Sequence, residues 1–320
     1  MTRPKILVAR RVFPEIVVRL QQHFEVDHNE GDQVLGAGLA ARLQGCAGIF
    51  ITGSERIDAA LLEACPDLKA VCAMTVGYNN IDVAACTARG VLVSNAPDVL
   101  TETTADFGFA LMMATARRIP ESEHYLRRGE WNRWGIDMFA GSDIHGAMLG
   151  ILGMGRIGQA IARRGHLGFG MKIIYHNRSR LAPDIEASLG ARWVSKEDLL
   201  RESDHLVLVL PYVPENHHII GAAELAMMKL TATLTNIARG GIVDDAALAA
   251  ALAKRTIAAA GLDVYEGEPQ LNPALLTVPN IVLTPHIASA SIPTRHAMAN
   301  LAVDNLIAAL TGGTMPTRLN

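Results

Sequence analysis

Residues 147–177 read AMLGILGMGRIGQAIARRGHLGFGMKIIYHN. The segment opens with a short apolar run at 148–152, which is typical of a buried parallel strand. Helical spacing follows over 156–167, and a second strand is predicted at 172–175. Three apolar side chains share the predicted inward face of this helix: Ile157, Ile161 and Leu167. The segment therefore predicts a strand, a tight turn, a helix and a second strand within about thirty residues.

The turn before this helix carries glycines in the spacing G-x-G-x-x-G, as Gly153, Gly155 and Gly158. Gly153 permits the tight turn, Gly155 lets the backbone approach a pyrophosphate, and Gly158 lets the helix pack close to the strand. The helix N-terminus offers unpaired N–H groups and a partial positive charge to an anion. Glycine-rich turns also occur in α/β proteins without a ligand, but the two flanking strands favour a dinucleotide site here.

The residues after the second strand indicate which dinucleotide is bound. An enzyme that uses NAD usually has Asp or Glu there to hold the ribose hydroxyls, whereas residues 176–180 read HNRSR and contain no acid. Asn177 does not repel a 2′-phosphate, Ser179 adds a hydroxyl beside it, and Arg178 and Arg180 can pair with the phosphate. The alternative is a surface loop with two solvated arginines. The charge pattern predicts NADP(H) as the preferred cofactor and leaves NAD(H) open.

Composition bounds the class of protein. The chain has 320 residues, half of them hydrophobic, and a net charge of −3 from 29 basic and 32 acidic residues. That length suits two domains, and the charge balance argues against a nucleic-acid partner. The four cysteines form no C-x-x-C pair, so no metal site is expected and free thiols in a cytoplasmic protein are predicted. Neither a signal peptide nor a membrane span is indicated.

The remaining pattern alternates strands and helices, which predicts an α/β protein with two doubly wound parallel sheets. Before residue 98, apolar strand runs are predicted at 5–9, 47–51, 70–73 and 91–93, with helices at 13–24, 38–43, 58–64 and 82–89. In the second half, strands are predicted at 148–152, 172–175, 206–210, 232–237, 257–264 and 280–283, with helices at 101–115, 156–167 and 246–253. A last helix at 294–310 has no strand of its own and is expected to pack on the first half. The predicted domains are therefore discontinuous: 1–98 with 291–320, and 99–290.

Residues 121–146 fit neither core nor sheet well. The segment is charged and carries Trp131 and Trp134. Because tryptophan is enriched at interfaces, we interpret it as an arm between subunits. The alternative is a surface helix whose tryptophans cover the local core.

Three reactive side chains each follow a predicted strand in the last third of the chain: Arg239, Glu268 and His286. Ligands of open parallel sheets bind beyond the carboxyl ends of the strands. An arginine fork holds a carboxylate with paired charge-assisted bonds. Histidine titrates near neutral pH, and a neighbouring carboxylate favours its charged form. The set suits proton transfer to a 2-keto acid, although each residue alone is more commonly a surface group.

Several motifs give the chain a close resemblance to the D-isomer-specific 2-hydroxyacid dehydrogenases, especially the glyoxylate/hydroxypyruvate reductase and 2-ketogluconate reductase branch. They are TVGYNNID at 75–82, TETTADFGFAL at 101–111, LGILGMGRIGQAIA at 149–162, NIARGGIVD, AAGLDVYEGEP and TPHIASA. The resemblance covers the whole length. It implies a flavodoxin-like substrate domain, a Rossmann cofactor domain and a homodimer that contacts through residues 121–146.

The same resemblance implies a role for each matching residue. Arg239 would bind the substrate carboxylate, His286 would donate the proton, and Glu268 would be the partner of His286. Further substrate contacts are implied for four residues: the backbone amides of Val76 and Gly77, Ser289, and Trp134 reaching the neighbouring subunit. Cofactor contacts are implied for Thr104, Arg156, Ile157, Pro211, Ile237, Ala238, Asp263 and Ala288, in addition to the glycine-rich turn and residues 177–180. Ala288 and Val213 depart from the glycine and threonine common in the family.

The implied activity is an NADPH-preferring reduction of small 2-keto acids such as glyoxylate, hydroxypyruvate or 2-ketogluconate to D-2-hydroxy acids. Phosphoglycerate dehydrogenase is an alternative, although the chain has no room for an added regulatory domain. Non-catalytic cofactor sensors of this fold, such as transcriptional corepressors, also keep the Arg, Glu and His. Formate dehydrogenase is disfavoured, because its pattern has Gln at position 268.

Overall fold

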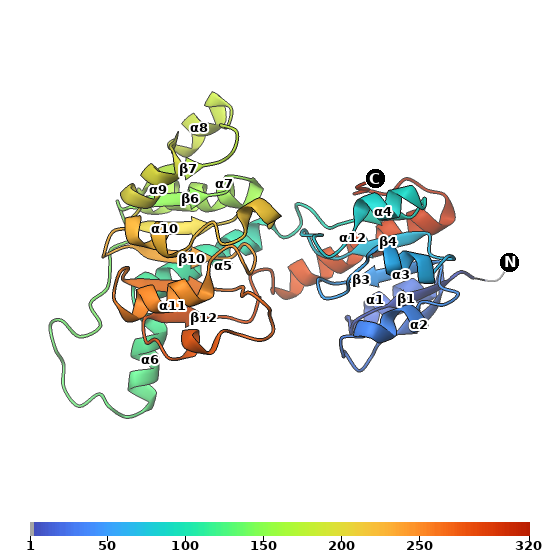
Figure 1. Ribbon diagram of the computed structural model, residues 1–320, viewed down its shortest axis with the longest axis horizontal. Coiled ribbons are helices and arrows are strands. Elements are labelled where there is room, and N and C mark those ends of the chain that lie inside the picture. Colours follow the sequence, from blue (N-terminus) through green and yellow to red (C-terminus); the bar gives the residue numbers. More distant parts are fainter. Residues whose placement is uncertain (1–2) are drawn as a thin grey trace. The chain divides into compact units, whose positions relative to one another are not determined.

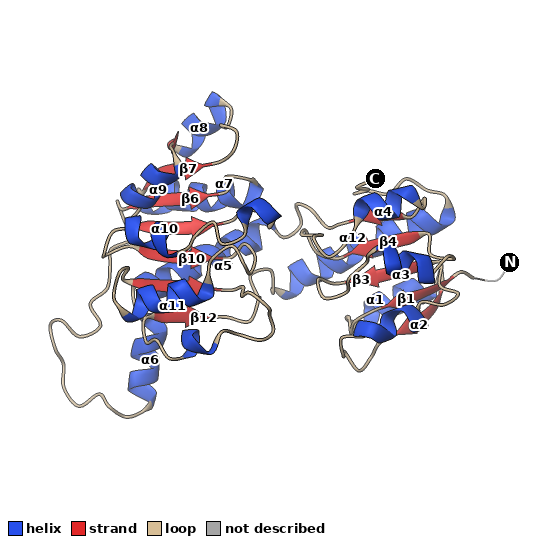
Figure 2. Ribbon diagram, in the orientation of Figure 1, coloured by secondary structure: helices blue, strands red, loops and turns tan. Residues whose placement is uncertain are grey.

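The computed structural model describes residues 3–320. The chain forms two compact units. One contains the chain up to Leu100 together with Ala290–Asn320, and the other is Thr101–Ser289. These divisions lie close to the domain limits predicted at 98 and 291. Each unit is an α/β layer structure, as Figures 1 and 2 show.

The first unit is built on a five-stranded parallel sheet in the order β2-β1-β3-β4-β5. Its strands are β1 (Lys5–Val8), β2 (Glu25–His28), β3 (Gly48–Ile51), β4 (Ala70–Ala73) and β5 (Leu92–Ser94). Its helices are α1 (Pro14–Gln21), α2 (Leu39–Arg42), α3 (Ala59–Ala64), α4 (Val83–Ala88) and α12 (Ile292–Thr311). This strand order is that of flavodoxin-like sheets. No strand was predicted at β2, because its residues, EVDH, contain no apolar run.

The two faces of this sheet are covered by different parts of the chain. Alternate residues such as Leu7, Ile49 and Val71 pack with the helices that precede β3, β4 and β5. The opposite face is covered by α1 and α12 (Figure 1), and a Cβ atom on Gly48 of β3 would lie 2.8 Å from Leu306 of α12. The last helix therefore supplies a face that the first hundred residues leave open.

The second unit is built on a seven-stranded parallel sheet in the order β12-β11-β10-β9-β6-β7-β8. Its strands are β6 (Met148–Leu152), β7 (Lys172–His176), β8 (Ala191–Trp193), β9 (His205–Leu208), β10 (Thr233–Asn236), β11 (Ala259–Leu262) and β12 (Ile281–Leu283). Its helices are α5 (Thr101–Ala116), α6 (Ile119–Arg127), α7 (Arg156–Arg163), α8 (Pro183–Leu189), α9 (Lys196–Glu202), α10 (Ala222–Met227) and α11 (Asp245–Ala253). Read from β8, the order is that of a Rossmann sheet with one strand added. The predicted fold class is confirmed.

Alternation along the strands gives this sheet a core on each face. In β9, Leu206 and Leu208 belong to the core beneath α9, α10 and α11, whereas Val207 between them belongs to the core with α5 and α7. Strands buried on both faces have continuous apolar sequences. The apolar runs predicted at 206–210 and 257–264 therefore mark β9 and β11, although both runs continue past the ends of the strands.

One detail of the helix predicted over 156–167 is wrong. The α-helix α7 ends at Arg163, and the chain continues through a π-helical turn, Arg164–Gly168. A π-turn adds a residue to the repeat and shifts the side chains that follow. Gly165 is consequently buried against Leu149, whereas Leu167, predicted to face inward, is 70% exposed.

The segment predicted as an arm begins with α6 and continues as turns and loops to residue 147. Trp131 and Trp134 are both exposed, Trp134 by 73%, and Ile136 is exposed as well. The tryptophans therefore do not cover the core of their own unit, and the predicted homodimer contact stays a prediction. Within residues 3–320, no helix combines the length and apolarity needed to cross a membrane.

We expect Leu234→Ala in β10 to destabilise the second unit by about 2–5 kcal/mol, because truncating a fully buried leucine removes apolar contacts and leaves a cavity. Leu230→Ala is the matched control, since Leu230 is mostly exposed. Urea unfolding followed by circular dichroism measures both variants. Equal midpoints for the two would contradict the assignment of Leu234 to the core.

Candidate active site

The reactive residues of the second unit follow the carboxyl ends of its strands. The glycine-rich turn follows β6, Arg239 follows β10, Glu268 follows β11, and His286 follows β12. All neighbouring strand pairs of this sheet are parallel, so these ends share one edge. This edge is where open α/β sheets bind ligands.

The glycine-rich turn is too tightly packed for side chains at two of its three glycines. Gly153 has φ +103°, and a Cβ atom there would lie 2.7 Å from the carbonyl carbon of Val209. A Cβ atom on Gly158 would lie 2.3 Å from the carbonyl oxygen of Gly153. A Cβ atom on Gly155 would meet no described atom within 4 Å. The turn is therefore closed beneath and open at Gly155, as close approach by a phosphate requires.

The start of α7 leaves room for an anion. Its N-cap residue is Gly155, which has no side chain to accept bonds from the first-turn N–H groups. The Oδ1 atom of Asn177 accepts a 2.7 Å hydrogen bond from the Met154 backbone N–H, and the Trp193 indole donates to the Asn177 carbonyl. Asn177 thus fixes the turn relative to β7, and Arg156 and Ile157 form the first turn of the helix.

The two arginines in the loop after β7 differ in their side-chain contacts. Arg178, Ser179 and Arg180 are all exposed. The Arg180 guanidinium, however, donates hydrogen bonds to both carboxylate oxygens of Glu186, and this carboxylate also accepts from the Tyr175 hydroxyl. The Arg180 charge already has a partner, which weakens its predicted role at a 2′-phosphate.

A buried hydroxyl without a partner supports the predicted cofactor cleft. Thr104 is buried in the first turn of α5, and its Oγ1 atom has no hydrogen-bond partner within residues 3–320. An unpaired buried polar group of this kind is commonly a place where water or a ligand binds. Ile237 and Ala238 are buried just beyond β10, Ala288 is buried beyond β12, and Pro211 is exposed beyond β9. The open turn, the uncapped helix and this hydroxyl fit a dinucleotide.

Glu268 and His286 form an ion pair. The His286 Nδ1 atom lies 2.6 Å from the Glu268 Oε1 atom, and the Tyr265 backbone N–H donates to the Glu268 Oε2 atom. Burial acts to raise the pKa of Glu268, but the hydrogen bond and charge of His286 and the charge of Arg239 outweigh it and lower the pKa. The carboxylate therefore stays ionised and holds the imidazole through Nδ1, which leaves Nε2 as the other proton-carrying atom.

Arg239 lies in the loop directly after β10. Burial lowers the pKa of its guanidinium, and the charge of Glu268 opposes that shift. Its Nη1 atom donates to the Ala238 carbonyl. Asn236 shapes the loop by accepting from the Ala238 N–H and donating to the Arg239 carbonyl. We did not predict this role of Asn236 from the sequence; a polar residue ending an otherwise buried strand was the available signal.

Asp263 organises the loop that carries His286. Its carboxylate accepts hydrogen bonds from the Thr284 hydroxyl and from the backbone N–H groups of Ile287 and Ala288. The residue is fully buried, and burial raises its pKa against these bonds. In this structure Asp263 supports the loop from below, and its predicted contact with a nicotinamide amide stays a prediction.

Two predicted substrate residues belong to the first unit and are described within it. Val76 and Gly77 follow β4, where the Thr75 hydroxyl donates to the Gly77 carbonyl and the Asn95 amide donates to the Val76 carbonyl. Both hydrogen bonds are accepted by backbone carbonyls, whereas the predicted substrate contact involves the backbone N–H groups of Val76 and Gly77. Ser289 is half-buried at the end of the second unit.

Comparison with known proteins gives this arrangement a family. A family model of the NAD-binding domain of D-isomer specific 2-hydroxyacid dehydrogenases matches residues 109–288. The chain is 46% identical to a glyoxylate reductase from Thermococcus kodakarensis, over 99% of the chain and 96% of that protein. It is 45% identical to glyoxylate/hydroxypyruvate reductase B from Klebsiella pneumoniae, over 97% of the chain and 96% of that protein.

Solved structures agree with these sequence matches. The NADPH-dependent glyoxylate/hydroxypyruvate reductase from Sinorhizobium meliloti, in complex with NADP and malonate, matches with a TM-score of 0.87 and 38% identity, over 99% of the chain and 97% of that protein. Fold, site and matches define an oxidoreductase with a nicotinamide cofactor. The chain belongs to the D-isomer specific 2-hydroxyacid dehydrogenase family, so the resemblance seen in the sequence is confirmed.

The loop that carries Glu268 rests on a second buried acid. Asp245, at the start of α11, accepts a 3.3 Å hydrogen bond from the Glu266 backbone N–H. Burial, reinforced by the charges of Glu266 and Asp244, raises the pKa of Asp245 to about 6. The folded protein therefore binds this proton at a pH where the unfolded chain, with a pKa of about 3.9, has lost it.

We expect the contribution of Asp245 to the free energy of unfolding to fall as the pH rises from about 4 to about 6. The reason is that the folded state binds this proton more tightly than the unfolded state and must release it over that range. Asp245→Asn keeps an oxygen acceptor and removes the titration. Thermal unfolding of both proteins between pH 4 and pH 7 measures the difference. A difference in stability that does not change with pH would contradict the raised pKa.

Proposed function

We propose that this protein is an NADPH-preferring reductase of small 2-keto acids, of the glyoxylate, hydroxypyruvate or 2-ketogluconate type, which forms D-2-hydroxy acids. The proposal depends on one observation: the 2.6 Å pair of His286 and Glu268 lies at the same sheet edge as the half-buried Arg239 and a glycine-rich turn. The relatives named as glyoxylate and hydroxypyruvate reductases support this substrate class.

The three residues divide the work of reducing a 2-keto acid. The guanidinium of Arg239 binds the substrate carboxylate and polarises the neighbouring carbonyl oxygen. His286 donates a proton from Nε2 to that oxygen, and Glu268 stabilises the imidazolium that makes the donation. Bound NADPH supplies the hydride for the carbonyl carbon. The amides of Val76 and Gly77 stay a prediction for the substrate carboxylate.

Burial strengthens this arrangement. The guanidinium of Arg239 is desolvated, and a desolvated charge interacts more strongly with an anion than one in bulk water does. A carboxylate bound beside the Arg239 guanidinium compensates for part of the hydration energy that the guanidinium loses on burial. A small, compact anion therefore gains more at this position than a neutral carbonyl compound does.

We expect His286→Ala to lower kcat for glyoxylate and hydroxypyruvate by about 10²–10⁴-fold, because the proton donor is lost, while the Kd for NADPH stays near that of the unaltered protein. Glu268→Gln should reduce kcat less, since the amide oxygen still accepts from Nδ1. Steady-state rates with glyoxylate, hydroxypyruvate, 2-ketogluconate and phosphohydroxypyruvate measure both effects and rank the substrates. Unchanged kcat in His286→Ala would refute the assigned role, and a preference for phosphohydroxypyruvate would favour phosphoglycerate dehydrogenase.

The cofactor preference rests on the loop after β7. Within residues 176–180 there is no acid that would repel a 2′-phosphate. The relative from Sinorhizobium meliloti is described as NADPH-dependent and was solved with NADP. Arg180 is engaged by Glu186, so Arg178 is our first candidate for the phosphate contact.

We expect Arg178→Ala to raise the KM for NADPH by about tenfold or more, since a charge-assisted hydrogen bond contributes about 1.5–3 kcal/mol, and to leave the KM for NADH nearly unchanged. Arg180→Ala is the matched comparison and should have the smaller effect on NADPH. Initial rates with both cofactors provide the test. Equal changes for NADPH and NADH in Arg178→Ala would remove the basis for the NADP preference.

A further inference from the structure

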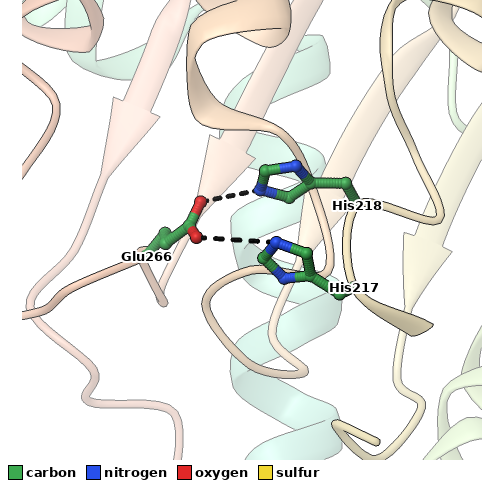
Figure 3. A group of neighbouring side chains, drawn as sticks. All are labelled: His217, His218 and Glu266. Carbon is green, nitrogen blue, oxygen red and sulfur yellow. Dashed lines mark hydrogen bonds and ion pairs between the residues drawn. The ribbon is translucent and has the colours of Figure 1, made fainter. Parts of the chain in front are cut away.

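Two histidines and a glutamate meet beside the catalytic loops without any part in the reaction above. His217 and His218 follow the 3-10 turn Pro214–Asn216, and Glu266 follows β11. Figure 3 shows both imidazole rings facing the Glu266 carboxylate. The His218 Nε2 atom lies 2.7 Å from one carboxylate oxygen, and the His217 Nε2 atom lies 3.9 Å from the other.

We propose that His217, His218 and Glu266 form a binding site for a transition-metal ion of the Zn²⁺ type. One potential ligand atom from each residue lies within 4.8 Å of the other two. Zn²⁺ binds imidazole nitrogen and carboxylate oxygen at about 2.0–2.2 Å. Small side-chain rotations therefore bring all three atoms into a shared coordination sphere. Two imidazoles favour Zn²⁺ or a similar ion over Mg²⁺ and Ca²⁺, which prefer oxygen ligands.

The second ring nitrogen of His217 lies within hydrogen-bond distance of a hydroxyl that can accept its proton. The Tyr212 hydroxyl lies 3.2 Å from the His217 Nδ1 atom. Metal-binding histidines commonly donate their second ring N–H to an oxygen, and this fixes the tautomer and the ring orientation. With Nδ1–H donating to Tyr212, the Nε2 lone pair faces Glu266.

The backbones of the other two ligands are held in place. The His218 N–H donates a 2.7 Å hydrogen bond to the Gly241 carbonyl, and its φ of +51° is in the left-handed region. The Glu266 N–H donates to the buried Asp245 carboxylate. The two rings also stack, with centroids 3.9 Å apart. The ligand backbones are thus held in place, while the stacked rings must tilt for both in-plane lone pairs to point at one metal ion.

The ligand side chains are each about one-third to one-half exposed: 43% for His217, 35% for His218 and 45% for Glu266. Solvent can therefore reach the ion and complete a tetrahedral sphere with water. The ion would also join the loop after β9 to the loop that carries Glu268.

The test is isothermal titration of the metal-free full-length protein with ZnCl₂ at pH 7.5, together with thermal unfolding with and without Zn²⁺. We expect one Zn²⁺ to bind per chain and to raise the Tm. His218→Ala and Glu266→Gln should each weaken binding at least tenfold, and Tyr212→Phe about tenfold through loss of the orienting bond. His23→Ala, an exposed histidine of the other unit, is the control and should bind as the unaltered protein does.

Circular dichroism and the Tm without metal establish that each variant is folded, and His217→Ala substitutes for any that is not. The proposal would be overturned by absence of saturable binding, by an affinity in His218→Ala and Glu266→Gln equal to that of the unaltered protein, or by MgCl₂ binding as tightly as ZnCl₂.

Discussion

The parallel register of β10, β11 and β12 is the constraint on which the candidate site depends. Asn236 of β10 is level with Leu262 of β11, which is level with Leu283 of β12. The three strands therefore end together, and the loops that follow begin at the same edge. Arg239, Glu268 and His286 are separated by 29 and 18 positions in the chain, yet this register delivers them to one place. A shift of a strand by one residue would turn its side chains to the opposite face.

Close packing then holds the loops together. A Cβ atom on Gly240 would lie 1.8 Å from the Tyr265 carbonyl oxygen, so the loops after β10 and β11 are in backbone contact there. The Tyr265 hydroxyl donates to the carbonyls of Leu262 and Thr284 and thereby joins the loops after β11 and β12. Below them lies the buried carboxylate of Asp263 with its three donors. Leaving a buried charge without such donors would be costly, so these three hydrogen bonds stabilise the loop that carries His286.

The same edge shows how a tertiary contact changes the meaning of a sequence pattern. Arg178 and Arg180 are equivalent in the sequence as cations without a neighbouring acid. In the fold, α8 brings Glu186 against Arg180, and the two form a paired salt bridge. Likewise, Glu266 and the two histidines are far apart in the chain, and only the packing of the loop after β9 on the loop after β11 brings them together. The arrangement of the two histidines and Glu266 has no local signal in the sequence.

The sequence alone determined the class of fold, the glycine-rich turn and the identity of the residues with reactive side chains. It could do so because apolar periodicity and the spacing of glycines are local properties of the chain. It did not predict β2 or β8, because their residues, EVDH and ARW, contain no continuous apolar run, and it placed Leu167 inward, because a π-turn has no simple periodic signature. Tertiary structure alone decided that Nδ1 of His286 is bound to Glu268, that Arg180 is occupied and that His217, His218 and Glu266 converge. The first and last of these contacts join loops distant in the chain, and their distances depend on how the whole sheet packs. Arg180 and Glu186 are only six positions apart, and their contact depends on how the loop after β7 folds against α8.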